Sequence, residues 1–173
     1  MMKKLYDVVN LTLLLLMALL LYSSYPRLPA RVPAHFNMAG QPDRWSGRGG
    51  LAALFVLPFI MTIVFYIAIK FVPRLGRYPR RLNIPHKEEF LRLPAEKQAV
   101  YWSLLREFFA GLMAAVNGLF YVILRGTVQI ATGESSLLPF TAMLPAFIVM
   151  LGLIVIYLRR MLVLPGKLIR GEE

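Results

Sequence analysis

The chain has 173 residues, of which 58% are hydrophobic and 17% are charged, and it contains no cysteine. Soluble domains are typically about 45–50% apolar and about 25% charged, so we expect much of this apolar surface to face lipid. The length allows one domain, and the missing thiol excludes disulfides, thiolate metal sites and cysteine nucleophiles. The net charge of +11 favours anionic lipid headgroups over nucleic acid as the partner, because the basic residues flank apolar runs.

Four long apolar runs predict an all-α fold, a polytopic integral-membrane bundle of four transmembrane helices forming one domain over residues 1–173. A helix needs about 20 mostly apolar residues to cross a hydrocarbon core of about 30 Å, where its backbone must satisfy its own hydrogen bonds. Arg125 interrupts the third run, so we expect this residue near the outer interface. The predicted spans are residues 6–25, 51–72, 108–131 and 137–158.

The first two spans are joined by an outer segment, residues 26–50, that is rich in residues with special conformational or chemical roles. Pro26, Pro29 and Pro33 favour an extended path, and the residues from Asn37 to Gly40 are typical of a turn. Four chemically distinctive side chains follow within eleven positions: His35, Asn37, Asp43 and Trp45. This density is higher than a simple spacer would need.

The distribution of lysine and arginine predicts that both termini are cytoplasmic. Fourteen of these residues lie in the N-terminal tail, the connector 73–107 and the C-terminal tail, whereas four lie in the outer segment. Cytoplasmic loops of membrane proteins carry an excess of Lys and Arg, so the connector is expected inside.

Within the connector, residues 94–107 predict an amphipathic helix at the inner membrane surface that runs into the third span. Pro94 suits the first turn of a helix. Tyr101 and Trp102 fit the aromatic belt of a membrane interface. The apolar side chains recur at near-helical spacing: Val100, Tyr101, Leu104, Leu105, Phe108 and Phe109.

The third span contains small residues at the spacing that lets helix backbones approach closely. Gly111 and Ala115 form one such pair, and Ala114 and Gly118 form the other. Asn117 in the same run is expected to hydrogen-bond to a neighbouring helix. We interpret these residues as helix-packing positions.

The outer segment resembles that of the SdpI-type immunity protein family and of related membrane proteins that share an outer domain of unknown function. The matching residues are Leu28-Pro29, Pro33, His35-Phe36-Asn37, Gly40, Asp43 and Trp45. A second stretch, Asn83-Ile84-Pro85-His86-Lys87, is similar to a connector motif of the same relatives, with His86 in place of their usual asparagine.

The resemblance implies a multi-pass protein of a prokaryotic plasma membrane, with an immunity or signalling function directed at a secreted peptide. The chain departs from the SdpI-type pattern in two ways. It has four predicted spans where those proteins have more, and the lysine usual after the motif is absent, with Arg48 the nearest basic residue.

Three interpretations of the outer motif follow from its chemistry. His35 and Asp43 could hydrogen-bond to each other within a rigid lid, the segment could bind a peptide or lipid, or His35, Asn37 and Asp43 could contribute to a metal site. The lid is favoured, because two ordinary metal ligands and one amide are a poor set. A separate hypothesis pairs Asp43 with Arg125, a cation near the hydrocarbon edge.

No enzyme motif, cofactor motif or metal-ligand cluster is present in the sequence, so a non-enzymatic binding protein is the predicted class. Two alternatives come from other classes. One is an accessory subunit packed among other membrane protein subunits. The other is a membrane metal hydrolase that uses His35 and Asp43.

Overall fold

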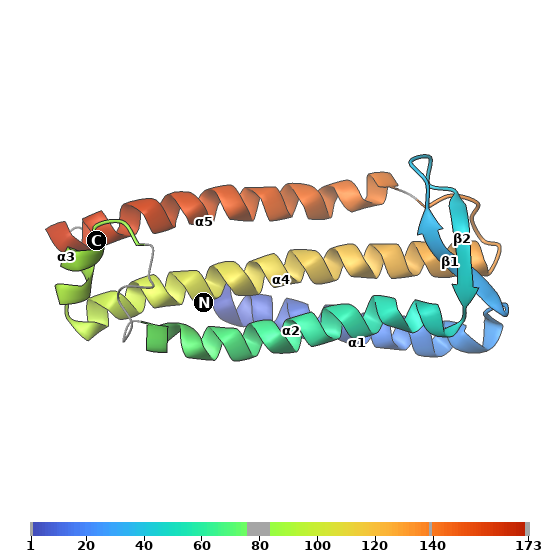
Figure 1. Cartoon of the computed structure of the whole chain (residues 1–173), viewed down its shortest axis with the longest axis horizontal. Coiled ribbons are helices and arrows are strands. Elements are labelled where there is room, and N and C mark those ends of the chain that lie inside the picture. Colours follow the sequence, from blue (N-terminus) through green and yellow to red (C-terminus); the bar gives the residue numbers. More distant parts are fainter. Residues whose placement is uncertain (1, 76–83, 139, 172–173) are drawn as a thin grey trace.

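The computed structural model describes residues 2–75, 84–138 and 140–171. Four long helices run side by side as a bundle, a β-hairpin lies at one end, and a short helix lies at the other (Figure 1). The elements in chain order are α1 (Met2–Ser24), a 3-10 turn (Tyr25–Arg27), β1 (Arg31–Phe36), β2 (Pro42–Gly47), α2 (Gly49–Leu75), α3 (Lys87–Arg92), α4 (Ala95–Ala131), a 3-10 turn (Phe140–Met143) and α5 (Leu144–Arg170).

Four of the described helices are long and apolar enough to cross a membrane, as predicted. The apolar segments are Lys4–Arg27, Gly49–Phe71, Ala95–Ala131 and Phe140–Arg170. Many of their large apolar side chains point away from the bundle, such as Leu11 on α1, which is 70% exposed, and Ile148 on α5, which is 68% exposed. Exposed apolar side chains on membrane-spanning helices are suited to contact with lipid.

The prediction of an all-α chain is corrected by the outer segment, which contains a two-stranded antiparallel sheet formed by β1 and β2. The proline pattern and the turn residues indicated an extended path and a turn, but they did not indicate that the two extended stretches pair. Pro33 and Pro42 lack a backbone N–H donor, so local sequence offers little indication that these two stretches form strands.

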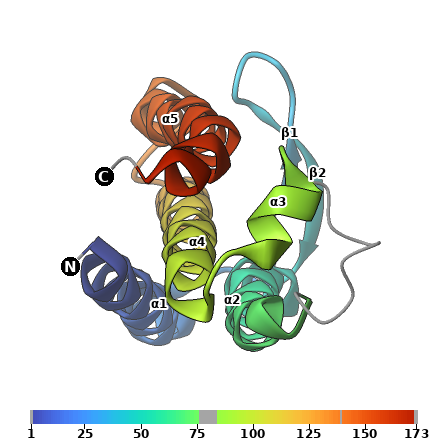
Figure 2. The same cartoon turned by 90° about the vertical axis from the view of Figure 1, so that its left-hand side faces the viewer.

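Helix α4 is the centre of the bundle and packs against α1, α2 and α5 (Figure 2). Its 37 residues correspond to about 55 Å, much longer than a hydrocarbon core of about 30 Å. The segment 94–107, predicted as an amphipathic helix that runs into the third span, belongs to this continuous helix, which begins at Ala95 (Figure 1).

Tyr101, Trp102 and Leu104 of that first part are buried against protein, although Val100 of the same stripe is 50% exposed, and this burial corrects the aromatic-belt interpretation. Tyr101 and Trp102 are each 6% exposed, and their rings meet the fully buried ring of Phe90 from α3 at 5.2 and 6.0 Å between centroids. Tyr157 and Met161 from α5 complete this cluster. The cluster therefore fixes α3 and both long helices at the end of the bundle opposite the hairpin (Figure 1).

A buried polar cluster joins α1, α2 and α4 inside the apolar bundle. The Asn117 amide, which is 0% exposed, donates to Oδ1 of Asn10 at 2.8 Å and to the hydroxyl of Thr62 at 3.1 Å. The Asn10 amide donates to the backbone carbonyls of Tyr6 and Ala110 at 2.9 and 3.0 Å. The predicted interhelical role of Asn117 is confirmed, and it extends to two helices.

The small residues of α4 differ in what surrounds them. A Cβ atom added at Gly111 would lie 3.0 Å from the Tyr6 ring of α1, so this glycine permits a close helix contact. Ala114 and Ala115 are 9% and 8% exposed. A Cβ atom at Gly118 would meet nothing within 4 Å, so this position does not carry a close contact within the described part of the chain.

Candidate functional site

The outer motif forms a hairpin that crosses the end of the helical bundle (Figure 1). Pro33 pairs with Trp45, His35 with Arg44, and Phe36 with Pro42. The register shifts on both sides of His35, so the pairing is irregular where the motif is densest. Such irregularities bend a strand and redirect its side chains.

Asn37 builds the turn of the hairpin. Its Oδ1 accepts hydrogen bonds from the backbone amides of Ala39 at 2.9 Å and Gln41 at 3.0 Å, the pattern of an Asx-type turn. Backbone hydrogen bonds of 2.9 Å close the same loop between Asn37 and Gln41 and between Gly40 and Asn37. Asn37 is therefore committed to holding the loop.

Gly40 docks the turn onto the segment between α4 and α5. It has φ +80°, a backbone conformation that residues other than glycine rarely adopt. Its carbonyl accepts a hydrogen bond of 2.8 Å from the amide of Leu138. An added Cβ atom would lie 2.7 Å from the Leu138 carbonyl oxygen, so the close approach needs glycine on steric grounds as well.

His35 and Asp43 join the two sides of the hairpin through a bond of 2.6 Å between Nδ1 and Oδ1. Their side chains are 54% and 40% exposed, so the pair lies at the surface. The predicted His35–Asp43 contact is confirmed. The hypothesis that Asp43 pairs with Arg125 is wrong, because no ion pair joins these two described residues and Arg125 is exposed.

Apolar side chains anchor the hairpin to the helices. Val32 is fully buried with Met17 of α1, Leu51 of α2 and Leu124 of α4. Phe36 packs instead against the cluster of Ile130, Leu138 and Met143. The two anchors hold β1 against opposite parts of the bundle end.

Two large apolar side chains of the hairpin face outward instead, one of them from the motif. Trp45 on β2 is 51% exposed, and Met38 at the tip of the hairpin is 98% exposed. Pro33 is buried and lies beside the helices. The motif therefore divides into an anchoring set and an exposed set, which comprises His35, Asp43 and Trp45.

A cavity of about 560 Å³ lies under the hairpin. Its hairpin side is formed by Pro33, His35 and Phe36. Its other walls come from α2, α4 and the segment before α5, and include Ala53, Leu54, Ile123, Leu138 and Phe140. The lining is mostly apolar, with the Thr127 and Ser46 hydroxyls as its neutral polar groups and His35 at its rim. Ligand pockets in proteins have this size and this composition.

Pro33, His35 and Phe36 were predicted from the sequence as motif residues, but the cavity that they line and its helical walls were not. Leu138, Phe140 and Met143 lie about 100 positions from the motif, and no local pattern connects them to it. Gly40 is the residue that could have indicated these walls. A glycine at the tip of a loop can mark a place where another segment of the chain approaches closely.

Metal chemistry finds little support in this geometry. Among the residues that the structure describes, no group of three or more His, Asp or Glu side chains is placed to hold a metal ion. His35 and Asp43 bond to each other, and the amide of Asn37 is directed at its own loop.

The second motif lies at the opposite end of the bundle (Figure 1). Asn83 lies outside the described residues, as do Arg77, Arg80 and Arg81 of the connector. Pro85 and His86 form a turn and Lys87 begins α3. His86 has φ +53°, a left-handed backbone conformation in which Asn and His are both enriched among the residues other than glycine.

Comparison with known proteins matches the part of the chain that carries the hairpin. Residues 12–73 match the model of a family described as Domain of unknown function (DUF1648). A protein of Archaeoglobus fulgidus named Uncharacterized protein is 29% identical over 143 residues, which cover 76% of this chain and 72% of the relative. No solved structure matches. The region similar to DUF1648 thus contains most of α1, the whole hairpin and most of α2.

Proposed function

We propose that the chain is a non-enzymatic binding protein of a prokaryotic plasma membrane, with both termini in the cytoplasm and the hairpin outside. The support for this orientation is the excess of Lys and Arg at the α3 end of the bundle. The start of α1, the end of α5 and α3 all lie away from the hairpin (Figure 1). This is expected if the chain crosses the membrane four times, because both of its ends are then on the same side.

The observation that carries the binding role is the cavity beneath the hairpin. Motif residues form one wall, and three other parts of the chain, from α2, α4 and the segment before α5, complete the cavity. A rigid lid with no ligand would need the anchors at Val32 and Phe36, but it would not need a mostly apolar space of about 560 Å³ behind them. The cavity suits one or two large apolar side chains of a ligand.

The exposed strand favours a peptide as that ligand. β2 pairs on one edge with β1, and its other edge is the end of the two-stranded sheet. An open edge can bind an extended peptide through main-chain hydrogen bonds, while a nearby pocket selects its side chains. Trp45 on β2 adds an exposed aromatic surface. Immunity or signalling in response to a secreted apolar peptide, as in SdpI-type proteins, is the function that this arrangement supports best.

A survival assay tests the proposal. Cells that express the chain, and cells that lack it, are challenged with a panel of secreted apolar antimicrobial peptides. We expect protection against at least one peptide, and we expect Ala53→Phe to abolish it by filling the cavity that Ala53 lines.

The matched control is Val56→Phe, one turn further along α2, where the side chain is 45% exposed and does not line the cavity. It should protect as the wild type does. Absence of protection by the wild type against every peptide, or full protection by Ala53→Phe, would overturn the proposed function.

A further inference from the structure

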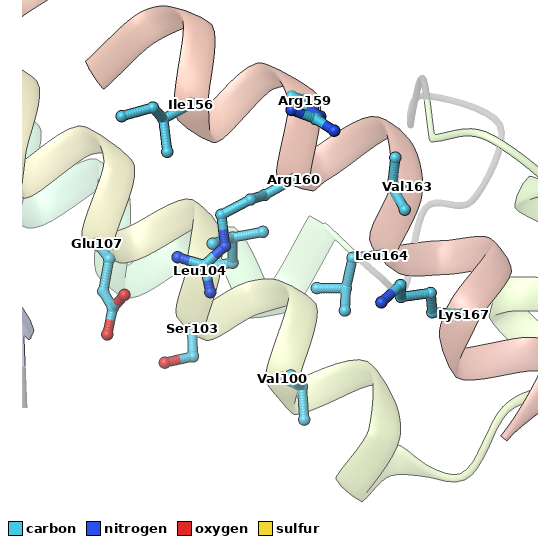
Figure 3. A pocket seen from close by; sticks show the side chains of 10 residues that line it. All are labelled: Val100, Ser103, Leu104, Glu107, Ile156, Arg159, Arg160, Val163, Leu164 and Lys167. Atoms are coloured by element: carbon cyan, nitrogen blue, oxygen red, sulfur yellow. The ribbon is translucent and has the colours of Figure 1, made fainter. Parts of the chain in front are cut away.

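A groove between α4 and α5 lies at the α3 end of the bundle, far from the hairpin, and has a volume of about 700 Å³ (Figure 3). On α4 its wall is formed by Val100, Ser103, Leu104 and Glu107, which recur every three or four residues and so share one face of the helix. The wall on α5 has the same spacing, from Ile156 to Lys167. The groove is thus the seam between two facing helix stripes.

The charges of the groove are unbalanced. Arg159, Arg160 and Lys167 line it from α5, and Glu107 is its one carboxylate. None of these three cations forms an ion pair with any residue that the structure describes. An anion bound here would meet an excess of positive charge that the protein itself does not neutralise.

Arg160 is held in position toward the groove. Its guanidinium lies 5.7 Å from the ring centroid of Tyr157, a buried side chain that also packs against Phe108 of α4. Figure 3 shows the Arg160 side chain reaching from α5 toward α4. A cation–π contact of this kind restricts the arginine without using its hydrogen-bond donors.

The order of residues along α5 matches the depth profile of a phospholipid. The uncharged run of α5 ends at Leu158, so Arg159 and Arg160 mark the edge of the hydrocarbon layer. Ile156, 56% exposed, lies on the acyl-chain side of that edge, and Lys167 lies on the headgroup side. From Ile156 to Lys167 the rise is about 16 Å, enough to follow a lipid from its first methylenes to its headgroup.

We propose that this groove binds one anionic phospholipid. Its phosphate is held by Arg159 and Arg160, its headgroup lies toward Lys167 and the Ser103 hydroxyl, and its acyl chain covers Ile156. Arginine pairs well with phosphate because the guanidinium presents several donors in a fixed plane. Glu107 opposes the bound charge and thus limits the affinity. This site does not depend on the outer hairpin or on its proposed ligand.

Lipid binding to the full chain in a mild detergent is measured by native mass spectrometry, with dioleoyl phosphatidylglycerol as the anionic probe and dioleoyl phosphatidylcholine as its zwitterionic counterpart. We expect a single phosphatidylglycerol to bind more tightly than phosphatidylcholine. Arg160→Gln should weaken phosphatidylglycerol binding about fivefold, the effect of one basic residue near a membrane surface. Glu107→Gln should strengthen it.

Lys70→Gln is the matched control, because it removes the same charge near the inner end of α2, outside the groove. It should leave the affinity unchanged. Equal losses for Arg160→Gln and Lys70→Gln would overturn the site, since they would reveal diffuse surface attraction. Glycerol phosphate alone, without acyl chains, should not compete; full competition would contradict a lipid site and indicate one for free phosphate esters.

Discussion

Replacing Asn117 by alanine should destabilise the bundle, because this side chain joins three helices. The substitution removes two hydrogen bonds between helices, one to Asn10 at 2.8 Å and one to Thr62 at 3.1 Å. Interhelical hydrogen bonds in membrane proteins contribute about 0.6 kcal/mol each on average and up to about 1.7 kcal/mol. The expected loss of unfolding free energy is therefore about 1–3 kcal/mol.

The measurement is reversible unfolding in mixed micelles by titration with sodium dodecyl sulfate, followed by helical circular dichroism. Thr127→Val is the control, because the Thr127 hydroxyl is buried but donates to the Ile123 carbonyl of its own helix. It should lower the unfolding free energy by less than Asn117→Ala does, because it removes no hydrogen bond between helices.

A double-mutant cycle of Asn10→Ala and Asn117→Ala isolates the contact itself. The coupling energy should be about 0.6 kcal/mol or more. Strictly additive effects of the two substitutions, or a Thr127→Val loss as large as that of Asn117→Ala, would refute the assignment of Asn117 as the polar link among the helices.

Three further predictions concern glycine and surface-charge positions. Gly40→Ala should destabilise the fold more than Gly133→Ala. Both glycines have φ near +80°, but only at Gly40 would the added Cβ atom meet backbone, 2.7 Å from the Leu138 oxygen. Equal shifts of the thermal unfolding midpoint would contradict the docking of the hairpin onto Leu138. Gly111→Ala should lower the unfolding midpoint by displacing Tyr6, whereas Gly118→Ala should be neutral or stabilising. A larger loss of stability for Gly118→Ala than for Gly111→Ala would be inconsistent with the α1–α4 contact. His35→Ala should reduce stability by less than about 1 kcal/mol, since the His35–Asp43 pair is exposed; a larger loss in the same titration would show that the pair is structurally central.

The four spans were predictable because long apolar runs have few alternatives to a helix in a membrane. The full lengths of the helices were predicted only in part. The third and fourth long helices extend well past the apolar runs: α4 begins at Ala95, close to the start of the predicted helix over 94–107, and α5 continues to Arg170, which was not predicted. These extensions are stabilised by packing around Phe90 and Tyr157, which depends on contacts that no local pattern records.

The motif residues of the hairpin were predicted, but their division of roles was not. Composition indicated that His35 and Asp43 could bond, and the structure confirms it. The sequence also indicated a turn from Asn37 to Gly40, but it did not indicate that Gly40 docks this turn onto Leu138, because that contact joins distant parts of the chain. Asp43 bonds to His35, eight positions away in the sequence, and not to the distant Arg125.

The buried polar cluster was predicted in only one of its members. Asn117 was singled out in the third span, whereas Asn10, which also lies in an uncharged run, and Thr62 were not. Their importance comes from helix rotation, which brings Asn10, Thr62 and Asn117 to one point between α1, α2 and α4. Rotation about a helix axis is set by packing and is not encoded by any single run.

Cysteine accessibility in intact cells tests the membrane arrangement most directly, because the natural chain contains no thiol. Single cysteines replace Met38 at the exposed tip of the hairpin and His86 at the exposed turn before α3, and a membrane-impermeant maleimide is applied before and after permeabilisation. Met38→Cys should react in intact cells, and His86→Cys should react only once the membrane is opened. Reaction of both from the same side would contradict a membrane-crossing α2, and the reverse pattern would contradict the cytoplasmic termini.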